Sequence, residues 1–228
     1  DFMITLETLK KNVEVQTLLK AEEKQLQVLG YTEHSLRHIT LTAKRAREIL
    51  TKLGCPQREV ELGEMAAYLH DIGNAVNRMN HPHSGAILAY QVLTKLGMAY
   101  DEAAEIMLAI GNHDEGSGLA VSKISAALII ADKCDVHRSR VRQSKLLPNK
   151  HLKDYTDIHD RVNYAVTENQ LIVDEKKKEI LLKLTVNTDI CSPMDYFEIF
   201  LQRMRMCLGA AQFIGYAFKL EINDYMLL

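Results

Sequence analysis

Apolar residues recur at helical spacing through the first two thirds of the chain, and glycine, proline and capping residues separate the runs. The pattern predicts a first helix from Leu6 to Leu29, which Gly30 closes. Thr32 is the expected cap of the second helix. Further helices are predicted over residues 32–53, 59–72, 84–96, 101–111 and 122–136. We therefore expect a helical domain that extends to about Arg142.

The pattern changes in the last third of the chain, where β-branched and alternating residues replace the helical period. Two β-rich runs flank a charged stretch and indicate a hairpin with a solvated turn. Ser192-Pro193 has the residue types of a helix start. The expected strands and helix cover residues 169–173, 179–186, 193–213 and 216–222. The predicted fold class is mainly α, with a small C-terminal α+β (β-β-α-β) appendage.

The composition is that of an ordinary globular protein and excludes several classes. The 228 residues are 47% hydrophobic and 25% charged, with a net charge of -2, so no basic field would attract nucleic acid or an anionic membrane. No apolar run approaches the roughly 20 residues that span a bilayer. The four cysteines include no C-x-x-C pair, which fits a reducing compartment. We expect a cytoplasmic protein with no membrane contact and no large nucleic-acid surface.

Seven of the nine histidines lie between His34 and His137, and the pair His70-Asp71 follows an apolar helical run. A polar pair at that place could be a helix cap, or it could supply two ligands for a divalent metal. Asp132 ends another apolar run, where an ionised carboxylate is costly if it is buried without a partner. If the carboxylate is buried, a metal ion would compensate its charge. If this helix turn is exposed, water solvates the carboxylate and no partner is needed.

Other histidines lie at helix boundaries, where side chains can face a cleft. His34 and His38 are four residues apart, share a helix face and could both be ligands. His81 and His83 flank a proline, and His113 follows the fifth predicted helix. A lone histidine on a helix is usually a surface or core residue, so the ordered set carries the signal.

Taken in order, these segments resemble the successive motifs of the HD-domain metal-dependent phosphohydrolases. The matching segments are Glu33–Arg37, Leu69–Gly73, His81 with Gly85-Ala86, Asn112-His113 and Ala131–Lys133. The resemblance covers about residues 30–142 and implies an HD-domain helical bundle. Together with the change of pattern after about Pro148, it divides the chain into an N-terminal helix (1–29), an HD domain (30–148) and a C-terminal subdomain (149–228).

The resemblance implies a set of metal ligands. The family motif His-x-x-Arg selects His34, followed by Arg37, and leaves His38 as a core residue or one that supports a ligand. A glycine four residues later selects His81 over His83. A dinuclear site is expected, with two divalent transition-metal ions (Fe, Mn or Zn) and Asp71 between them. The implied ligands are His34, His70, Asp71, His81, His113 and Asp132.

Two subgroups are similar to parts of the chain, and neither decides the substrate. The HD-GYP phosphodiesterases of cyclic-di-GMP resemble residues 69–73 and 112–118, but Leu119 follows Gly118, so the Gly-Tyr-Pro motif is missing. Asn74 stands where that subgroup usually has lysine. The bacterial HD hydrolases of diadenosine tetraphosphate are similar around His34, His81 and 132–138.

The expected activity is hydrolysis of a phosphoester or phosphoanhydride in a nucleotide-type substrate, by a metal-activated water near Asp71. Arg138 and Lys133 are candidate phosphate contacts, and Asn74 and His83 could orient substrate or pass a proton. One alternative is a non-catalytic nucleotide- or metal-sensing module whose C-terminal subdomain binds a partner. Another is a helical scaffold with accidental histidines. The appendage could cover the site or form a homodimer.

Overall fold

The structure, a computed structural model, describes residues 3–32, 36–142 and 157–228. The helical part contains α1 (Leu6–Lys11), α2 (Val13–Leu29), α3 (Leu36–Lys52), α4 (Gln57–Leu69), α5 (His81–Lys95), α6 (Tyr100–Gly111) and α7 (Lys123–Lys133), with short 3-10 turns η1 (Ile72–Ala75) and η2 (Arg138–Arg140). The C-terminal part contains α8 (Ile158–Ala165), β1 (Val166–Asp174), β2 (Glu179–Val186), α9 (Pro193–Phe213), β3 (Ala217–Ile222) and β4 (Tyr225–Met226). The predicted fold class is confirmed.

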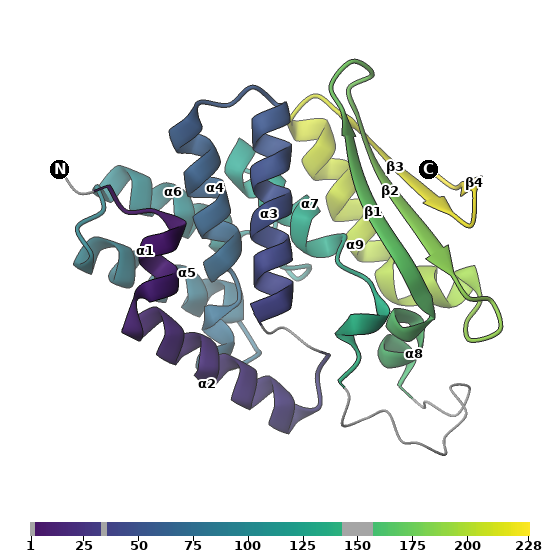
Figure 1. The fold of residues 1–228 in the computed structure, drawn as a ribbon, viewed down its shortest axis with the longest axis horizontal. Helices are drawn as coiled ribbons and strands as arrows, with labels where there is room; N and C mark the ends of the chain where they lie inside the picture. Colours follow the sequence, from purple (N-terminus) through teal and green to yellow (C-terminus); the bar gives the residue numbers. More distant parts are fainter. Residues whose placement is uncertain (1–2, 33–35, 143–156) are drawn as a thin grey trace.

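α7 is the centre of the helical part because its surface is apolar nearly all round. Residues 126–131 are fully buried in an unbroken run. α3, α4 and α6 pack around this helix on one side, and α9 packs on it from the C-terminal part (Figure 1). Ser122 caps the start of α7, where its hydroxyl oxygen accepts a hydrogen bond from Ser125 N at 3.1 Å.

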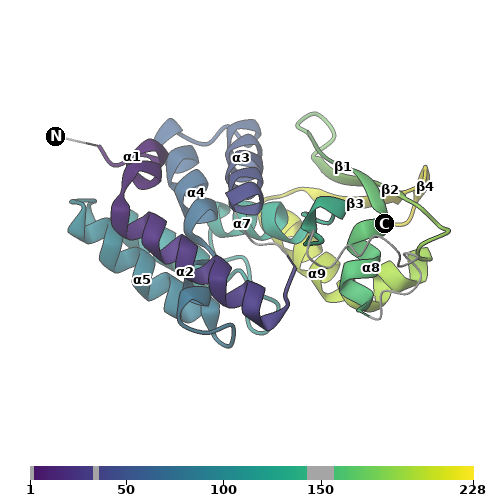
Figure 2. The ribbon, with the colours of Figure 1, turned by 60° about the horizontal axis from the view of Figure 1, so that its bottom comes forward.

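The N-terminal segment differs from its prediction, since two helices replace the single helix expected from Leu6 to Leu29. The break falls at Asn12, whose side-chain oxygen accepts a hydrogen bond from Val15 N at 2.9 Å and caps α2. Gly30 ends α2 in the left-handed conformation, as predicted. α2 lies across the ends of α3 and α4 and packs against η1 (Figures 1 and 2).

The C-terminal part is a four-stranded sheet in the order β1-β2-β3-β4, with α9 packed against it. β1 and β2 form the predicted antiparallel hairpin. β2 and β3 are parallel, so the chain between them must cross over, and α9 is that crossover. β4 adds a short antiparallel edge beyond β3 that the sequence did not predict. None of the described helices is long and apolar enough to cross a membrane.

Candidate metal centre

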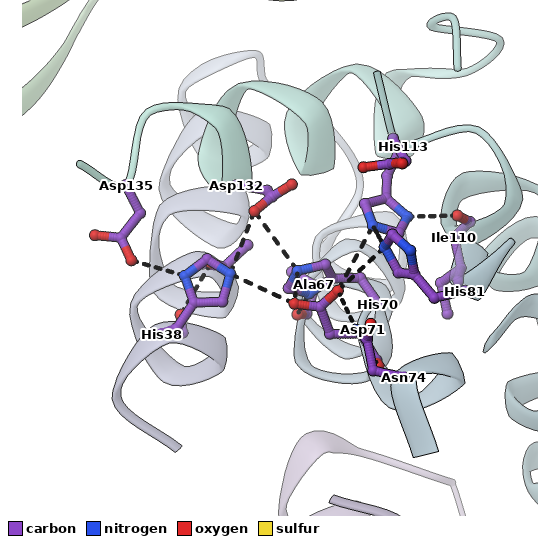
Figure 3. A network of polar contacts seen from close by, with 12 residues as sticks. His38, Ala67, His70, Asp71, Asn74, His81, Ile110, His113, Asp132 and Asp135 are labelled. Carbon is purple, nitrogen blue, oxygen red and sulfur yellow. Dashed lines mark hydrogen bonds and ion pairs between the residues drawn. The ribbon is translucent and has the colours of Figure 1, made fainter. Parts of the chain in front are cut away.

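Six polar side chains converge on one point inside the helical part of the molecule (Figure 3). Five helices, α3 to α7, bring them there at or near a helix end or in the turn that follows it. Most are fully buried, which is costly for polar groups unless they are paired or bind a cation. The six residues, which we call the His/Asp cluster, are His38, His70, Asp71, His81, His113 and Asp132.

Main-chain carbonyls orient three of the imidazole rings from outside. In His70, His81 and His113, Nδ1 lies 2.8, 3.0 and 2.6 Å from the carbonyl oxygen three residues earlier in the chain. A carbonyl oxygen only accepts hydrogen bonds, so Nδ1 must carry the proton. In the neutral ring the lone pair is then on Nε2, which points towards the rest of the cluster. This is the tautomer that histidine ligands of metals commonly adopt.

One half of the cluster contains Asp71, His81 and His113. The Nε2 atoms of His81 and His113 are 3.3 Å apart, and Asp71 Oδ1 lies 3.4 and 3.9 Å from them. Two nitrogen lone pairs that face each other at this distance repel unless a proton or a cation lies between them. The three ligand atoms therefore fit a divalent ion with nitrogen and oxygen ligands.

The other half contains His38, His70 and Asp132, together with the second oxygen of Asp71. Oδ1 of Asp132 lies 3.2 Å from His38 Nε2 and 3.6 Å from His70 Nε2. Oδ2 of Asp71 lies 3.2 Å from His70 Nε2 and 3.9 Å from His38 Nε2. The two carboxylate oxygens of Asp71 thus face different halves, which is the geometry that a bridging ligand needs (Figure 3).

The pKa shifts show the charge that each group prefers. Burial, with help from His70 and Lys133, lowers the pKa of His113 well below its usual value, so this ring is neutral. Burial raises the pKa of Asp132, but Lys133, His38 and His70 outweigh it and hold that pKa well below its usual range. Burial lowers the pKa of His70, yet Asp71 and Asp132 raise it well above its usual value. The carboxylates therefore attract a cation to this point, and a metal would compete with the proton for His70.

A buried carboxylate supports His38 from the side away from the cluster. Asp135 Oδ2 lies 2.7 Å from His38 Nδ1, 2.8 Å from an Arg37 nitrogen and 3.0 Å from an Arg140 nitrogen. Burial raises the pKa of Asp135, but Arg140 and His38 outweigh it, so the group is ionised. A carboxylate behind an imidazole fixes its tautomer and makes it a stronger ligand.

Five of the six residues that the sequence selected as ligands lie together in the cluster, and they are His70, Asp71, His81, His113 and Asp132. The sixth, His34, lies outside the described residues. His38, which we expected in the core or behind a ligand, faces Asp71 and Asp132 directly. The helical period could have predicted that His38 faces inward, because His38 lies on the same buried face of α3 as Thr42, Arg45 and Ile49.

The other predicted site residues have different surroundings. Lys133 is buried, with Nζ 2.8 Å from Asp132 Oδ2, so it contacts the cluster directly. Asn74 donates a hydrogen bond to Asp71 Oδ1 at 3.0 Å and orients that carboxylate. Arg138 instead stacks over the Tyr164 ring, and His83 is exposed on α5; no contact with the cluster is seen for either among the described residues. His81, and not His83, faces the other side chains of the cluster.

Sequence reasoning missed Arg78, which is next to the cluster. Its Nη1 lies 3.3 Å from His81 Nε2, 3.3 Å from Asn74 Oδ1 and 4.0 Å from Asp71 Oδ1. Arg78 lies in the turn between η1 and α5, where no periodic pattern or motif marks it.

A family model and two known proteins are similar to parts of this chain. Residues 31–139 match the family model of the HD domain. An uncharacterized protein of Methanocaldococcus jannaschii is 28% identical over 202 residues, which cover 78% of this chain and 74% of the relative. The crystal structure of a predicted HD superfamily hydrolase from an uncultured Thermotogales bacterium covers 59% of this chain and 75% of its own, with 23% identity and a TM-score of 0.43. The His/Asp cluster therefore lies within residues 31–139, the part of the chain that is similar to the HD domain.

Proposed function

We propose that this protein hydrolyses a phosphoester or phosphoanhydride bond and that the His/Asp cluster holds two divalent transition-metal ions. The observation that carries the proposal is the position of Asp71, whose two oxygens face two different sets of nitrogen and oxygen ligands. A purely structural helical bundle has no use for six polar residues that converge in its interior. Ligands of this kind suit iron, manganese or zinc better than magnesium.

When bound, two such ions would supply an activated water and positive charge for the phosphoryl oxygens. The residues of the chain would hold the ligands of these ions in position. Asn74 holds Asp71 in one orientation through hydrogen bonds to its side chain and its carbonyl oxygen. The carbonyl groups behind His70, His81 and His113 hold the Nε2 lone pairs inward. Lys133 offsets the charge of Asp132, whose Oδ2 lies 2.8 Å from its Nζ.

A nucleotide-type substrate is the finer part of the proposal. It is supported by the motif resemblance to hydrolases of cyclic dinucleotides and dinucleoside polyphosphates. Cationic side chains at the cluster, Lys133 and Arg78, fit a phosphorylated ligand. The small net charge of -2 fits a small ligand better than a long nucleic acid.

The test combines metal analysis with turnover. Protein purified anaerobically is assayed on an aryl phosphodiester and on cyclic dinucleotides, dinucleoside polyphosphates and mononucleotides. We expect two equivalents of transition metal and hydrolysis of at least one substrate class. Asp71→Asn is expected to lose metal and to lower turnover by more than about 100-fold. Asp101→Asn, at an exposed position at the start of α6, is the matched control.

Three outcomes are decisive. Parent protein without transition metal, or an Asp71→Asn protein that keeps metal and turns over like the parent, contradicts the proposal. Parent protein that holds two ions but hydrolyses none of these substrates supports the non-catalytic sensing module instead.

A further inference from the structure

Arg78 lies between the buried cluster and the solvent. Its side chain is about one quarter exposed (24%), whereas the side chains it faces, Asp71 and His81, are 3% and 2% exposed. The turn that carries Arg78 also exposes Val76 and Met79, so this side of the cluster borders the surface. A ligand that approaches the Asp71–His81–His113 half from this side meets Arg78 first.

The present partners of Arg78 are the atoms that a metal would use. Nη1 faces the lone pair of His81 Nε2 at 3.3 Å, and Asp71 Oδ1 is 4.0 Å away. A guanidinium only donates hydrogen bonds, so it competes with a cation for both atoms. With a divalent ion on these ligands, the guanidinium would lose His81 as an acceptor, keep only Asn74 Oδ1 at 3.3 Å and face a like charge. It then needs an anion on its outer side.

We propose that Arg78 binds the phosphoryl group of the substrate and that Tyr31 positions its guanidinium. The inference rests on the proposed function, since it assumes that a phosphorylated ligand reaches the His/Asp cluster. Arginine suits the task because its planar fork matches two phosphoryl oxygens at once, which lysine cannot do.

Tyr31 supplies the support that an exposed arginine needs. The Arg78 guanidinium carbon lies 5.6 Å from the centre of the Tyr31 ring, within the range of a cation–π contact. The main chain at Tyr31 is fixed in turn, because Arg142 Nε donates a hydrogen bond of 2.8 Å to its carbonyl oxygen. Tyr31 is itself 43% exposed, so the contact lies close to the surface of the protein.

The arginine that sequence reasoning favoured is less well placed. Arg138 stacks over Tyr164, and no contact between it and the cluster is seen among the described residues. Lys133 does reach the cluster, but Asp132, Asp114 and Glu115 surround its ammonium group at 2.8–3.6 Å. Arg78 has long hydrogen bonds to neutral acceptors and can leave them for a phosphate at little cost.

The test measures binding of inorganic phosphate to metal-replete protein by calorimetry, with metal content determined on the same samples. We expect Arg78→Met to keep both metal ions and to bind phosphate roughly 10- to 100-fold more weakly. Arg78→Lys should recover only part of the loss. Arg47→Met removes a surface arginine of α3 that pairs with Glu64 at 2.7 Å, and it should bind like the parent.

Variants at Tyr31 test the positioning role separately. Tyr31→Phe keeps the ring and should bind phosphate like the parent, whereas Tyr31→Ala should bind it roughly three-fold more weakly. The inference is wrong if Arg78→Met binds phosphate like the parent, if it loses metal, or if the metal-replete parent binds no phosphate. Failure of the proposed function looks different: the parent would bind metal and phosphate but hydrolyse no phosphoester.

Discussion

The pair His70-Asp71 shows why single residues were ambiguous in the sequence. A helix cap and a metal ligand both explain a histidine after an apolar helix, and the structure shows features of both. His70 is the C-cap residue of α4, with Nδ1 2.8 Å from the carbonyl oxygen of Ala67, while Nε2 faces Asp71 and Asp132. The helix-end contact therefore fixes the ring in the orientation that a ligand needs.

The choice between His34 and His38 gives a sharp prediction at this scale. His38→Ala removes the nitrogen that lies 3.2 Å from Asp132, so we expect the protein to lose at least one equivalent of metal. His34→Ala should keep both equivalents. Elemental analysis of the two purified variants, with circular dichroism as a check on folding, makes the comparison. Metal loss in the His34 variant alone would contradict this expectation and support the assignment made from the sequence.

Residue types and their order were readable from the sequence, and the direction in which His38 faces was not. The family motif selected His34 and left His38 in the core or behind a ligand. Among the described residues of α3, His38 faces Asp71 and Asp132. Spacing along the chain could not show this, because it does not give the rotation of α3 relative to α4 and α7.

At the scale of elements, two glycines bring η1 and α5 into direct contact. A Cβ atom on Gly73 would lie 1.9 Å from the carbonyl oxygen of His81 and 2.5 Å from the nitrogen of Gly85. Main chain therefore packs on main chain at this point. Because Asp71 precedes η1 and His81 begins α5, the contact sets the distance between two proposed ligands.

Gly73→Ala is expected to force η1 and α5 apart. Overpacking against main chain costs about 1–3 kcal/mol or more, and metal affinity should fall as well because Asp71 and His81 separate. Urea unfolding and metal titration measure the two effects. Gly116→Ala is the matched control, since its Cβ would meet nothing within 4 Å. Equal stability and metal affinity in the two variants would show that the contact has no such role.

The β1-β2 hairpin, α9 and β3 were predictable one by one, but α8, β4 and the attachment of this part to the cluster were not. The strands and α9 follow local periodicity and capping residues. The contacts of α9 with the helical part depend on distant residues: Arg203 Nε lies 2.5 Å from Glu115 Oε1, and Gln202 donates to the Glu115 carbonyl oxygen at 2.6 Å. Glu115 follows His113 by two residues, so the appendage holds the loop that carries a proposed ligand.

At the scale of the whole molecule, the N-terminal helices are part of the wall around the cluster. Gln25 of α2 donates to the carbonyl oxygen of Asn74 at 2.7 Å, and Asn74 in turn holds Asp71. Glu22, one helical turn earlier, is buried, and neither of its carboxyl oxygens has a hydrogen-bond partner among the described residues. Burial, and then the charge of Asp71, raises the pKa of Glu22 well above its usual value.

Glu22 should make the stability of the metal-free protein depend on pH. The folded state holds this proton more tightly than the unfolded state does, so its contribution is complete at low pH and declines as the pH rises from about 4.5 through the folded pKa. Glu22→Gln should therefore flatten the decline of unfolding free energy with rising pH. Urea unfolding with a chelator, between pH 4 and 8, measures the slope.

Glu14→Gln is the control for this experiment, because Glu14 lies on the same helix and pairs with Lys95 at an exposed position. It should keep the slope of the parent. A Glu22→Gln protein with the slope of the parent would show that this carboxyl group does not titrate differently in the folded state.

The central claim is that one carboxylate, Asp71, joins two metal positions built from histidine and aspartate. Anomalous scattering from crystals grown with Mn²⁺ or Zn²⁺ tests it most directly. The account predicts two peaks about 3.5–4 Å apart. One should contact His38, His70 and Asp132, the other His81 and His113, and both should contact Asp71. A single peak, peaks outside the His/Asp cluster, or no peak in metal-loaded crystals would contradict it.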